Sequence, residues 1–424
     1  MLKHEDNERL CRVGPGTPMG EVFRRYWIPA LLSEELPKPD CPPVRVRLLG
    51  EDLIAFRDSE GKLGLVDAYC PHRRAPLFWA RNEECGLRCV YHGWKFDTTG
   101  QCVDMPNEPA ESNFKHKVKI TSYPCWEQAG IIWTYMGPAD ELPPVPDYEW
   151  IRAPKTHRHV SKTYESCNWL QGLEGGIDTS HSSFAHNNNI ADKNALRTRA
   201  PSPKLEVVKT DYGFSYVGIR DLKEDGNYVR GYQYIMPAQQ MRGAIIRWKD
   251  GKMEEFPSIA GHLWVPIDDA TTWVWNFIYS SEPSIPFTEE FVLKHETEFG
   301  RGPEDVLPGY RLKRNPSNDF LIDREVQRTK TFTGIQGINT QDYALQETME
   351  KPYCDRSKEK LGTADTAIIA ARQMLLEATR TVEKGGRPRG VDPLTYRNVR
   401  GCDRLISKEL HWSEAMKEDF AAKF

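Results

Sequence analysis

Two cysteines and two histidines are spaced as the ligands of a metal centre would be. A C-x-H pair at Cys70 and His72 is followed, sixteen residues later, by a C-x-x-H pair at Cys89 and His92. Two thiolates and two imidazoles suit either a tetrahedral zinc ion or a two-iron cluster with both imidazoles on one iron. Structural zinc sites more often keep like ligands together in sequence. The mixed pairs therefore favour the iron–sulfur cluster, with a zinc-stabilised binding protein as the alternative.

A second group of possible ligands lies within residues 168–186, NWLQGLEGGIDTSHSSFAH. Glu174, Asp178 and His181 are spaced i, i+4 and i+7, which predicts that they share one face of a helix. His186 follows five residues later. Two such histidines and a carboxylate from elsewhere would form the 2-His-1-carboxylate site of non-haem Fe(II) oxygenases. A lone pair of this kind is more often a surface feature, but a one-electron carrier in the same chain favours the metal site.

These residues are expected to be positioned by two domains of different construction. Short strands broken by turns fill residues 44–138, whereas the later chain mixes helices at 165–187 and 289–299 with strands over 203–281. A final helix is predicted over 366–383, with Asp365 as its N-cap. The proline-rich segment 137–156 separates the two patterns. We therefore predict a small all-β domain over residues 1–148 and a larger α+β domain over 149–424.

Composition limits the possible partners. The 424 residues hold 57 Lys and Arg against 61 Asp and Glu, a net charge of −4, so no basic footprint for nucleic acid or an anionic membrane is present. No run approaches the ~18 apolar residues of a membrane span, and the N-terminus lacks the apolar stretch of a signal peptide. We therefore expect a soluble, cytoplasmic protein without membrane or nucleic-acid contacts. Its ten cysteines are then mostly buried thiols.

Several of these motifs are similar to those of one enzyme family. C-P-H-R at 70–73, C-x-Y-H-G-W at 89–94 and D-x-x-G at 97–100 resemble the Rieske domain of bacterial aromatic-ring oxygenases. N-W-x-Q-x-x-E-G at 168–175 and D-x-x-H-x₄-H at 178–186 resemble the catalytic domain of their single-subunit members, the phthalate-dioxygenase-like group. The resemblance implies an α+β chain in which a Rieske [2Fe–2S] domain precedes a helix-grip-type catalytic domain with a curved antiparallel sheet. It also implies two cofactors, a [2Fe–2S] cluster and Fe(II).

The resemblance assigns roles to individual residues. It implies that Cys70, His72, Cys89 and His92 hold the cluster and that His181 and His186 hold the mononuclear iron. Its third ligand is expected to be Asp342, because Gln341-Asp342 matches a dipeptide that precedes a helix late in the family's catalytic domain. Asp355 and Asp365 are the rivals, and we interpret them as a partner of Arg356 and a helix cap.

The family also implies how the two metals communicate. Asp178 matches the carboxylate that connects a cluster histidine of one subunit, here His92, with an iron histidine of the next, here His181. The chain is then a homotrimer with subunits head to tail, or a stacked hexamer. Because no G-x-G-x-x-G fingerprint follows a strand, a separate flavin and iron–sulfur reductase is expected to supply electrons from NAD(P)H.

The expected activity is that of an aromatic ring-hydroxylating dioxygenase. The resemblance implies insertion of both atoms of O₂ into the ring of an aromatic carboxylate of the phthalate, isophthalate or chlorobenzoate type. The alternative is a Rieske monooxygenase that removes an O- or N-alkyl group. An arginine can bind a carboxylate through two parallel hydrogen bonds, and four basic residues lie on the predicted strands. They are Arg230, Arg242, Arg247 and Lys249, of which Arg242 is the preferred substrate contact.

Overall fold

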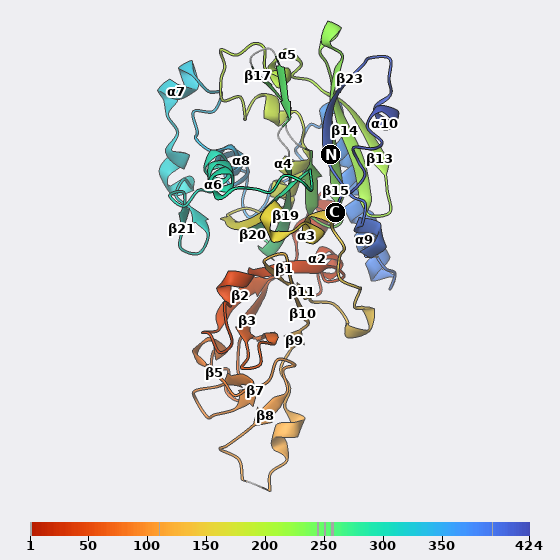
Figure 1. Ribbon diagram of the computed structural model, residues 1–424. Coiled ribbons are helices and arrows are strands. Elements are labelled where there is room, and N and C mark those ends of the chain that lie inside the picture. The colour runs from red at the N-terminus through yellow and green to blue at the C-terminus, as the bar shows by residue number, and fades with distance from the viewer. Residues whose placement is uncertain (1, 110, 244–245, 250–251, 256–257, 392) are drawn as a thin grey trace.

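A computed structural model describes residues 2–109, 111–243, 246–249, 252–255, 258–391 and 393–424. Its N-terminal β structure projects from a larger part in which helices surround an antiparallel sheet (Figure 1). The predicted α+β class is confirmed. None of the described helices is long and apolar enough to cross a membrane.

The N-terminal part is built from short antiparallel strands joined by tight turns. Two four-stranded sheets and one three-stranded sheet have the following strand orders. They are β2 (Val44–Leu48)-β3 (Glu51–Arg57)-β4 (Leu63–Asp67)-β9 (Ser122–Tyr123), β5 (Arg81–Glu83)-β6 (Gly86–Arg88)-β7 (Lys95–Phe96)-β8 (Cys102–Asp104) and β1 (Trp27–Leu32)-β11 (Ile131–Tyr135)-β10 (Cys125–Gln128). Alternating apolar residues such as Ile54 and Phe56 bury one face in a small separate core. This core also contains Cys70 and Cys89, so the predicted cluster ligands rest on a packed base.

An eight-stranded antiparallel sheet forms the centre of the larger part. Its strand order is β12 (Arg158–Glu165)-β20 (Thr271–Ser280)-β19 (Ser258–Asp268)-β16 (Gln239–Arg242)-β15 (Asn227–Ile235)-β14 (Gly213–Asp221)-β13 (Lys204–Lys209), and β23 (Cys402–Ile406) also pairs with β15. The hairpins β17 (Ile246–Lys249)-β18 (Lys252–Glu255) and β21 (Val306–Leu307)-β22 (Arg311–Leu312) lie outside it. The predicted run of strands over 203–281 is thereby confirmed.

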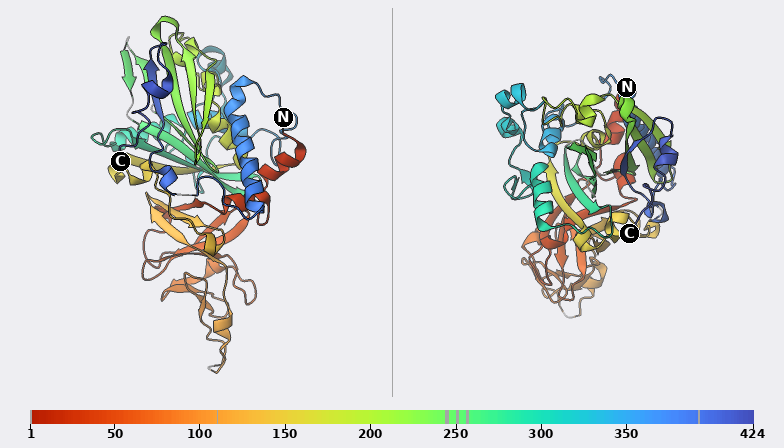
Figure 2. Two further views of the ribbon diagram at one scale, coloured as in Figure 1. Left: turned by 90° about the vertical axis from the view of Figure 1, so that its right-hand side faces the viewer. Right: turned by 45° about the horizontal axis from the view of Figure 1, so that its top comes forward.

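Helices pack against the middle of this sheet and against one of its ends. The short helix α4 (Trp169–Ile177) contacts β19, β16 and α8 (Ile338–Gln346), and this junction holds the site described below. The long helix α9 (Thr366–Glu383) contacts β13 and β14 and also the N-terminal helices α1 (His4–Cys11) and α2 (Pro18–Phe23), as Figure 2 shows. On the far side lie α6 (Glu289–Glu298) and α7 (Arg324–Thr329), and the remaining short helices are α3 (Glu149–Arg152), α5 (Leu196–Arg199) and α10 (Trp412–Ala415).

The structure corrects three local predictions. Helix α9 has the predicted bounds and Asp365 occupies its N-cap position, but the Asp365 carboxylate makes no capping hydrogen bond and accepts one from Gly362 N–H instead. The helix predicted over 165–187 ends at Ile177, where Asp178 turns to extended backbone. Glu174 therefore does not share a face with Asp178; it lies in a buried ion pair with Arg356 and Arg372.

Candidate metal centres and substrate pocket

The first predicted site is formed by two turns that face each other. Cys70 N–H donates to the carbonyl of Ala75, and Cys89 N–H donates to that of Trp94, so each Cys–His pair lies in a closed turn. The rings of His72 and His92 have centroids 4.3 Å apart. The structure thus brings both halves of the motif together.

The donor atoms of this site fit a two-iron cluster. Interaction with the Cys70 thiol lowers the pKa of Cys89 to about 6, and the interaction with Cys89 together with burial raises the pKa of Cys70. His72 stacks on Trp94 at 4.6 Å, and its buried Nδ1 has no hydrogen-bond partner, so the atom is free to bind a metal. Within the described residues these four ligands do not form one compact group, which a single zinc ion would require. Ligands divided between two irons would be spread in this way.

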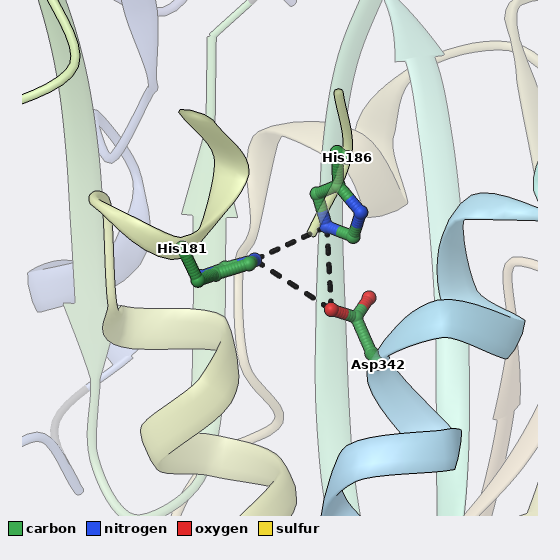
Figure 3. A group of neighbouring side chains, drawn as sticks. All are labelled: His181, His186 and Asp342. Carbon is green, nitrogen blue, oxygen red and sulfur yellow. Dashed lines mark hydrogen bonds and ion pairs between the residues drawn. The ribbon is translucent and has the colours of Figure 1, made fainter. Parts of the chain in front are cut away.

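The second predicted site is compact (Figure 3). His181 Nε2 lies 3.1 Å from His186 Nε2, and Asp342 Oδ1 lies 3.5 Å and 3.2 Å from these two atoms. The histidines come from the loop after α4, whereas Asp342 comes from α8. One atom from each residue converges within 4.8 Å, which is the arrangement that a single metal ion needs. Although burial opposes it, the two imidazoles lower the pKa of Asp342 to about 2, so the carboxylate is ionised.

Neighbouring side chains fix the orientation of both imidazoles. Gln341 Oε1 lies 2.9 Å from His186 Nδ1, and Gln341 is itself held because it donates to Asn188 Oδ1 at 2.8 Å. Asp178 Oδ2 lies 3.5 Å from His181 Nδ1. Each ring thus directs Nε2 toward the site and Nδ1 toward a polar partner, as is usual around metal-binding histidines. Gln341 was singled out in the sequence only as part of a dipeptide, so this contact was not predicted.

The end of α4 explains how Asp178 reaches His181. Asp178 is the C-cap residue of the helix, and its Oδ1 accepts hydrogen bonds from both the backbone N–H and the hydroxyl of Ser180. Oδ2 therefore remains directed at His181. Although burial opposes ionisation, the contact with His181 lowers the pKa of Asp178. The carboxylate is thus a fixed negative charge beside His181, His186 and Asp342, which are called the triad below.

Glycines on α4 allow the sheet to pack closely against this helix. An added Cβ at Gly172 or Gly176 would lie 2.4 Å or 2.2 Å from the Trp264 side chain on β19. At Gly175 it would lie 2.0 Å from Gln346 on α8. Because no larger residue fits, Gly172, Gly175 and Gly176 allow α4 to pack closely against its neighbours beside the triad.

A pocket opens next to the triad. Its wall contains all three triad residues together with Asp178 and the following residues: Arg197, Arg230, Tyr232, Arg242, His262, Trp264, Val274 and Phe299. The cavity has a volume of about 80 Å³ on the scale used for buried waters. That exceeds the ~10–15 Å³ needed by one water, so the pocket has room for a small molecule.

The pocket carries positive charge that few described side chains balance. Arg230 pairs with Asp403 at 3.3 Å, but Arg197 donates only to the carbonyl of Ser182. In the described part of the chain, neither Arg197 nor Arg242 has an acidic partner. Burial and the neighbouring Arg230 lower the pKa of each of these two residues to about 10. Arg242 therefore lies where it was predicted, whereas Arg197 was missed; the side chains of Arg247 and Lys249 lie outside the described residues.

The rival carboxylates are placed away from the triad. Asp355 accepts hydrogen bonds from Ser357 and pairs with Lys358 at 3.1 Å. It does not pair with Arg356, as the sequence had suggested, because Arg356 is bound by Glu174. Neither Asp355 nor Asp365 lines the pocket.

The two sites lie at opposite ends of one chain. The turns after β4 and β6 belong to the projecting N-terminal part, whereas α4 and α8 lie within the larger part (Figure 1). A single subunit thus keeps its candidate cluster site apart from its candidate iron site.

Comparison with known proteins agrees with this geometry. Residues 26–124 match the Rieske [2Fe-2S] domain family, and residues 134–423 match the family described as LigXa C-terminal domain like. The chain is 38% identical to the phthalate 4,5-dioxygenase oxygenase subunit of Pseudomonas putida, covering 98% of this chain and 94% of that protein. It is 37% identical to the 3-chlorobenzoate-3,4-dioxygenase oxygenase subunit of Comamonas testosteroni, with 99% and 98% covered.

Other similar proteins carry out different oxygenations. The 5,5'-dehydrodivanillate O-demethylase oxygenase subunit of Sphingobium sp. is 31% identical, with 92% of this chain and 84% of that protein covered. Among solved structures, the terminal oxygenase of carbazole 1,9a-dioxygenase from Novosphingobium sp. KA1 shares the fold with a TM-score of 0.60 at 19% identity, over 89% of this chain and 99% of that one. The family described as LigXa C-terminal domain like covers more than half of this chain, and the relatives named above span nearly all of it. This chain therefore belongs to the Rieske oxygenases, the oxidoreductases that act with O₂ by means of a [2Fe–2S] cluster and a mononuclear iron.

Proposed function

We propose that this chain is the terminal oxygenase that inserts both atoms of O₂ into the ring of an aromatic carboxylate of the phthalate, isophthalate or chlorobenzoate type. The observation that carries the proposal is the pair Arg197 and Arg242 in the pocket wall, half-buried and without an acidic partner among the described residues. A buried charge without a counter-ion is costly. A carboxylate substrate would supply the missing negative charge, and its ring would pack on Trp264, Val274 and Phe299.

The metal assignments are part of the same proposal. Cys70, His72, Cys89 and His92 would hold the cluster, and His181, His186 and Asp342 would hold the mononuclear iron. The three triad atoms approach from one side, which leaves the pocket side open. When bound, the iron would provide the site at which O₂ is activated, with electrons supplied one at a time by the cluster. The chain itself would exclude bulk water and orient the ring.

We further infer that the electrons cross between subunits. Because the two sites of one chain lie apart, the cluster of a neighbouring copy would serve each triad, as in a head-to-tail homotrimer or a stacked hexamer. Asp178 would then connect His181 with His92 of the partner subunit. The electrons would come from NAD(P)H through a separate flavin and iron–sulfur reductase, in the cytoplasm.

Replacement of the pocket arginines tests the substrate class. We expect Arg242→Gln and Arg197→Gln each to weaken binding of the carboxylate substrate by about 10²-fold, since loss of one partner of a buried charge pair costs about 2–5 kcal/mol. Binding of the matching neutral amide should change little. Titration of substrate and amide against each variant measures both. Arg199→Gln is the matched control, because Arg199 pairs with Asp225 outside the pocket; equal weakening of acid and amide would contradict the proposal.

Product analysis separates dioxygenation from the second candidate function. A Rieske monooxygenase that removes an alkyl group is favoured by the similarity to the O-demethylase subunit. With isotopically labelled O₂ and a reductase, we expect aromatic acids to give diols that carry two labelled oxygens. A labelled aldehyde together with a phenol or amine that carries no labelled oxygen would show the dealkylation instead.

A further inference from the structure

A buried carboxyl group behind the pocket has no place in the assignments above. Glu165 is the last residue of β12 and is fully buried, at 0% exposure. Neither Oε1 nor Oε2 has a hydrogen-bond partner. An ionised carboxylate in such surroundings would be very unfavourable, so Glu165 is a neutral acid that carries a proton.

The charges around Glu165 lead to the same protonation state. Burial raises its pKa well above the usual value, and the nearby carboxylates of Glu347 and Asp342 add to this effect. The thiol of Cys167 and the ammonium group of Lys351 act in the opposite direction and lower the pKa of Glu165, but the Lys351 ammonium group is directed to the carbonyl of Ser166. The neighbouring thiol of Cys167 is also buried and donates to the carbonyl of Asn168.

Glu165 reaches the pocket wall at a position without a side chain. An ideal Cβ on Gly172 would lie 2.9 Å from Glu165 Oε2 and 2.5 Å from Trp264 Nε1. Both Gly172 and Trp264 line the pocket. The carboxyl therefore lies against Gly172 and the Trp264 ring, two residues that separate it from the pocket.

Other buried carboxylates near the pocket are already engaged. Glu174 is held by Arg356 and Arg372, and Asp178 by Ser180 and His181. Glu347 accepts a hydrogen bond from the backbone N–H of Ser166 at 2.7 Å. Among these groups, Glu165 alone combines a proton with unoccupied hydrogen-bonding atoms next to the pocket.

The reaction of the family needs protons in this pocket. Dihydroxylation of an arene follows ArH + O₂ + 2 e⁻ + 2 H⁺ → ArH(OH)₂, and oxidative removal of a methyl group with formation of water also takes up two electrons and two protons. The reductase supplies the electrons. We propose that Glu165 is a proton-relay residue, which passes its proton through water beside Gly172 into the pocket and is reprotonated afterwards. The proposal holds for either oxygenation, so it does not depend on the substrate proposed above.

Infrared difference spectroscopy tests the protonation state without turnover. In the metal-free protein at neutral pH, the wild-type spectrum minus that of Glu165→Gln should contain the carbonyl stretch of a protonated carboxyl group. Glu347 accepts a hydrogen bond from the backbone N–H of Ser166, whereas no described backbone N–H donates to Glu165, so the Glu165 band should lie at higher frequency than any band removed by Glu347→Gln. Absence of the band would overturn the proposal.

Single-turnover product formation tests the relay. With electrons preloaded, Glu165→Gln should form product about 10²-fold more slowly, the usual lower range for loss of a proton-transfer group. Cluster spectrum, iron content and substrate affinity should remain those of the wild type. Glu347→Gln is the matched control and should keep the wild-type rate.

A second variant keeps the test informative if Glu165→Gln folds poorly. Glu165→Asp keeps the proton but withdraws it by one methylene, so an intermediate rate together with a retained infrared band would support the relay. A wild-type rate in either variant with intact metal sites would overturn it.

Discussion

Asp342→Ala is expected to release the mononuclear iron and to abolish turnover while the cluster spectrum stays unchanged. The carboxylate supplies one of three converging atoms, at 3.2 Å from His186 Nε2 and 3.5 Å from His181 Nε2. Two imidazoles alone would hold a divalent ion far more weakly and without a defined open side. The cluster turns lie in the other part of the molecule, with a hydrophobic core of their own, and should not respond.

Metal analysis combined with optical and EPR spectra measures this result. Wild-type protein should contain three irons per chain, two in the cluster and one in the triad. Asp342→Ala should contain two, with the reduced cluster signal retained. Asp355→Ala is the matched control, since Asp355 pairs with Lys358 and does not line the pocket. Full iron content in Asp342→Ala would show that the third ligand is another residue and that the assignment of Asp342 is wrong.

The ligand positions could be predicted because they are encoded over short distances. Cys70 and His72, or Cys89 and His92, lie in single turns whose backbone hydrogen bonds close over four to five residues. His181 and His186 likewise lie in one loop. Only Asp342 comes from a distant element, and it was found through the family's dipeptide. Local spacing therefore sufficed to predict which of these residues lie together, whereas their role as ligands stays a prediction.

Contacts between distant segments could not be predicted in the same way. The i, i+4 spacing placed Glu174 beside Asp178, but the helix ends at Ile177 and two arginines far along the chain bind Glu174. Arg197 and Glu165 gain their meaning only from burial and from missing partners, which depend on the whole fold. A sequence pattern records which groups are present, whereas their charge balance is decided by packing.

The second large effect is expected for Asp178→Asn. This variant should keep the cluster and the iron. The reduced cluster should be reoxidised by O₂ in the substrate-bound enzyme about 10- to 100-fold more slowly, since contacts to metal-binding histidines commonly contribute that much. Asparagine preserves the size of the side chain and can still accept from Ser180 through its carbonyl oxygen. It replaces the negative charge directed at His181, and its amide group would oppose the Nδ1–H of that imidazole.

Rapid mixing of the reduced enzyme with O₂ and substrate distinguishes a connecting role from a structural one. If Asp178 only stabilised the end of α4, the variant would lose iron or unfold, and reoxidation per remaining iron would be normal. If it connects His181 with His92 of the partner subunit, iron content and the size of the assembly should be unchanged while reoxidation slows. Asp192→Asn, in an exposed turn, controls for the loss of one charge. Rapid reoxidation in Asp178→Asn with both metals bound would exclude the connecting role, and electrons would then need another route between subunits.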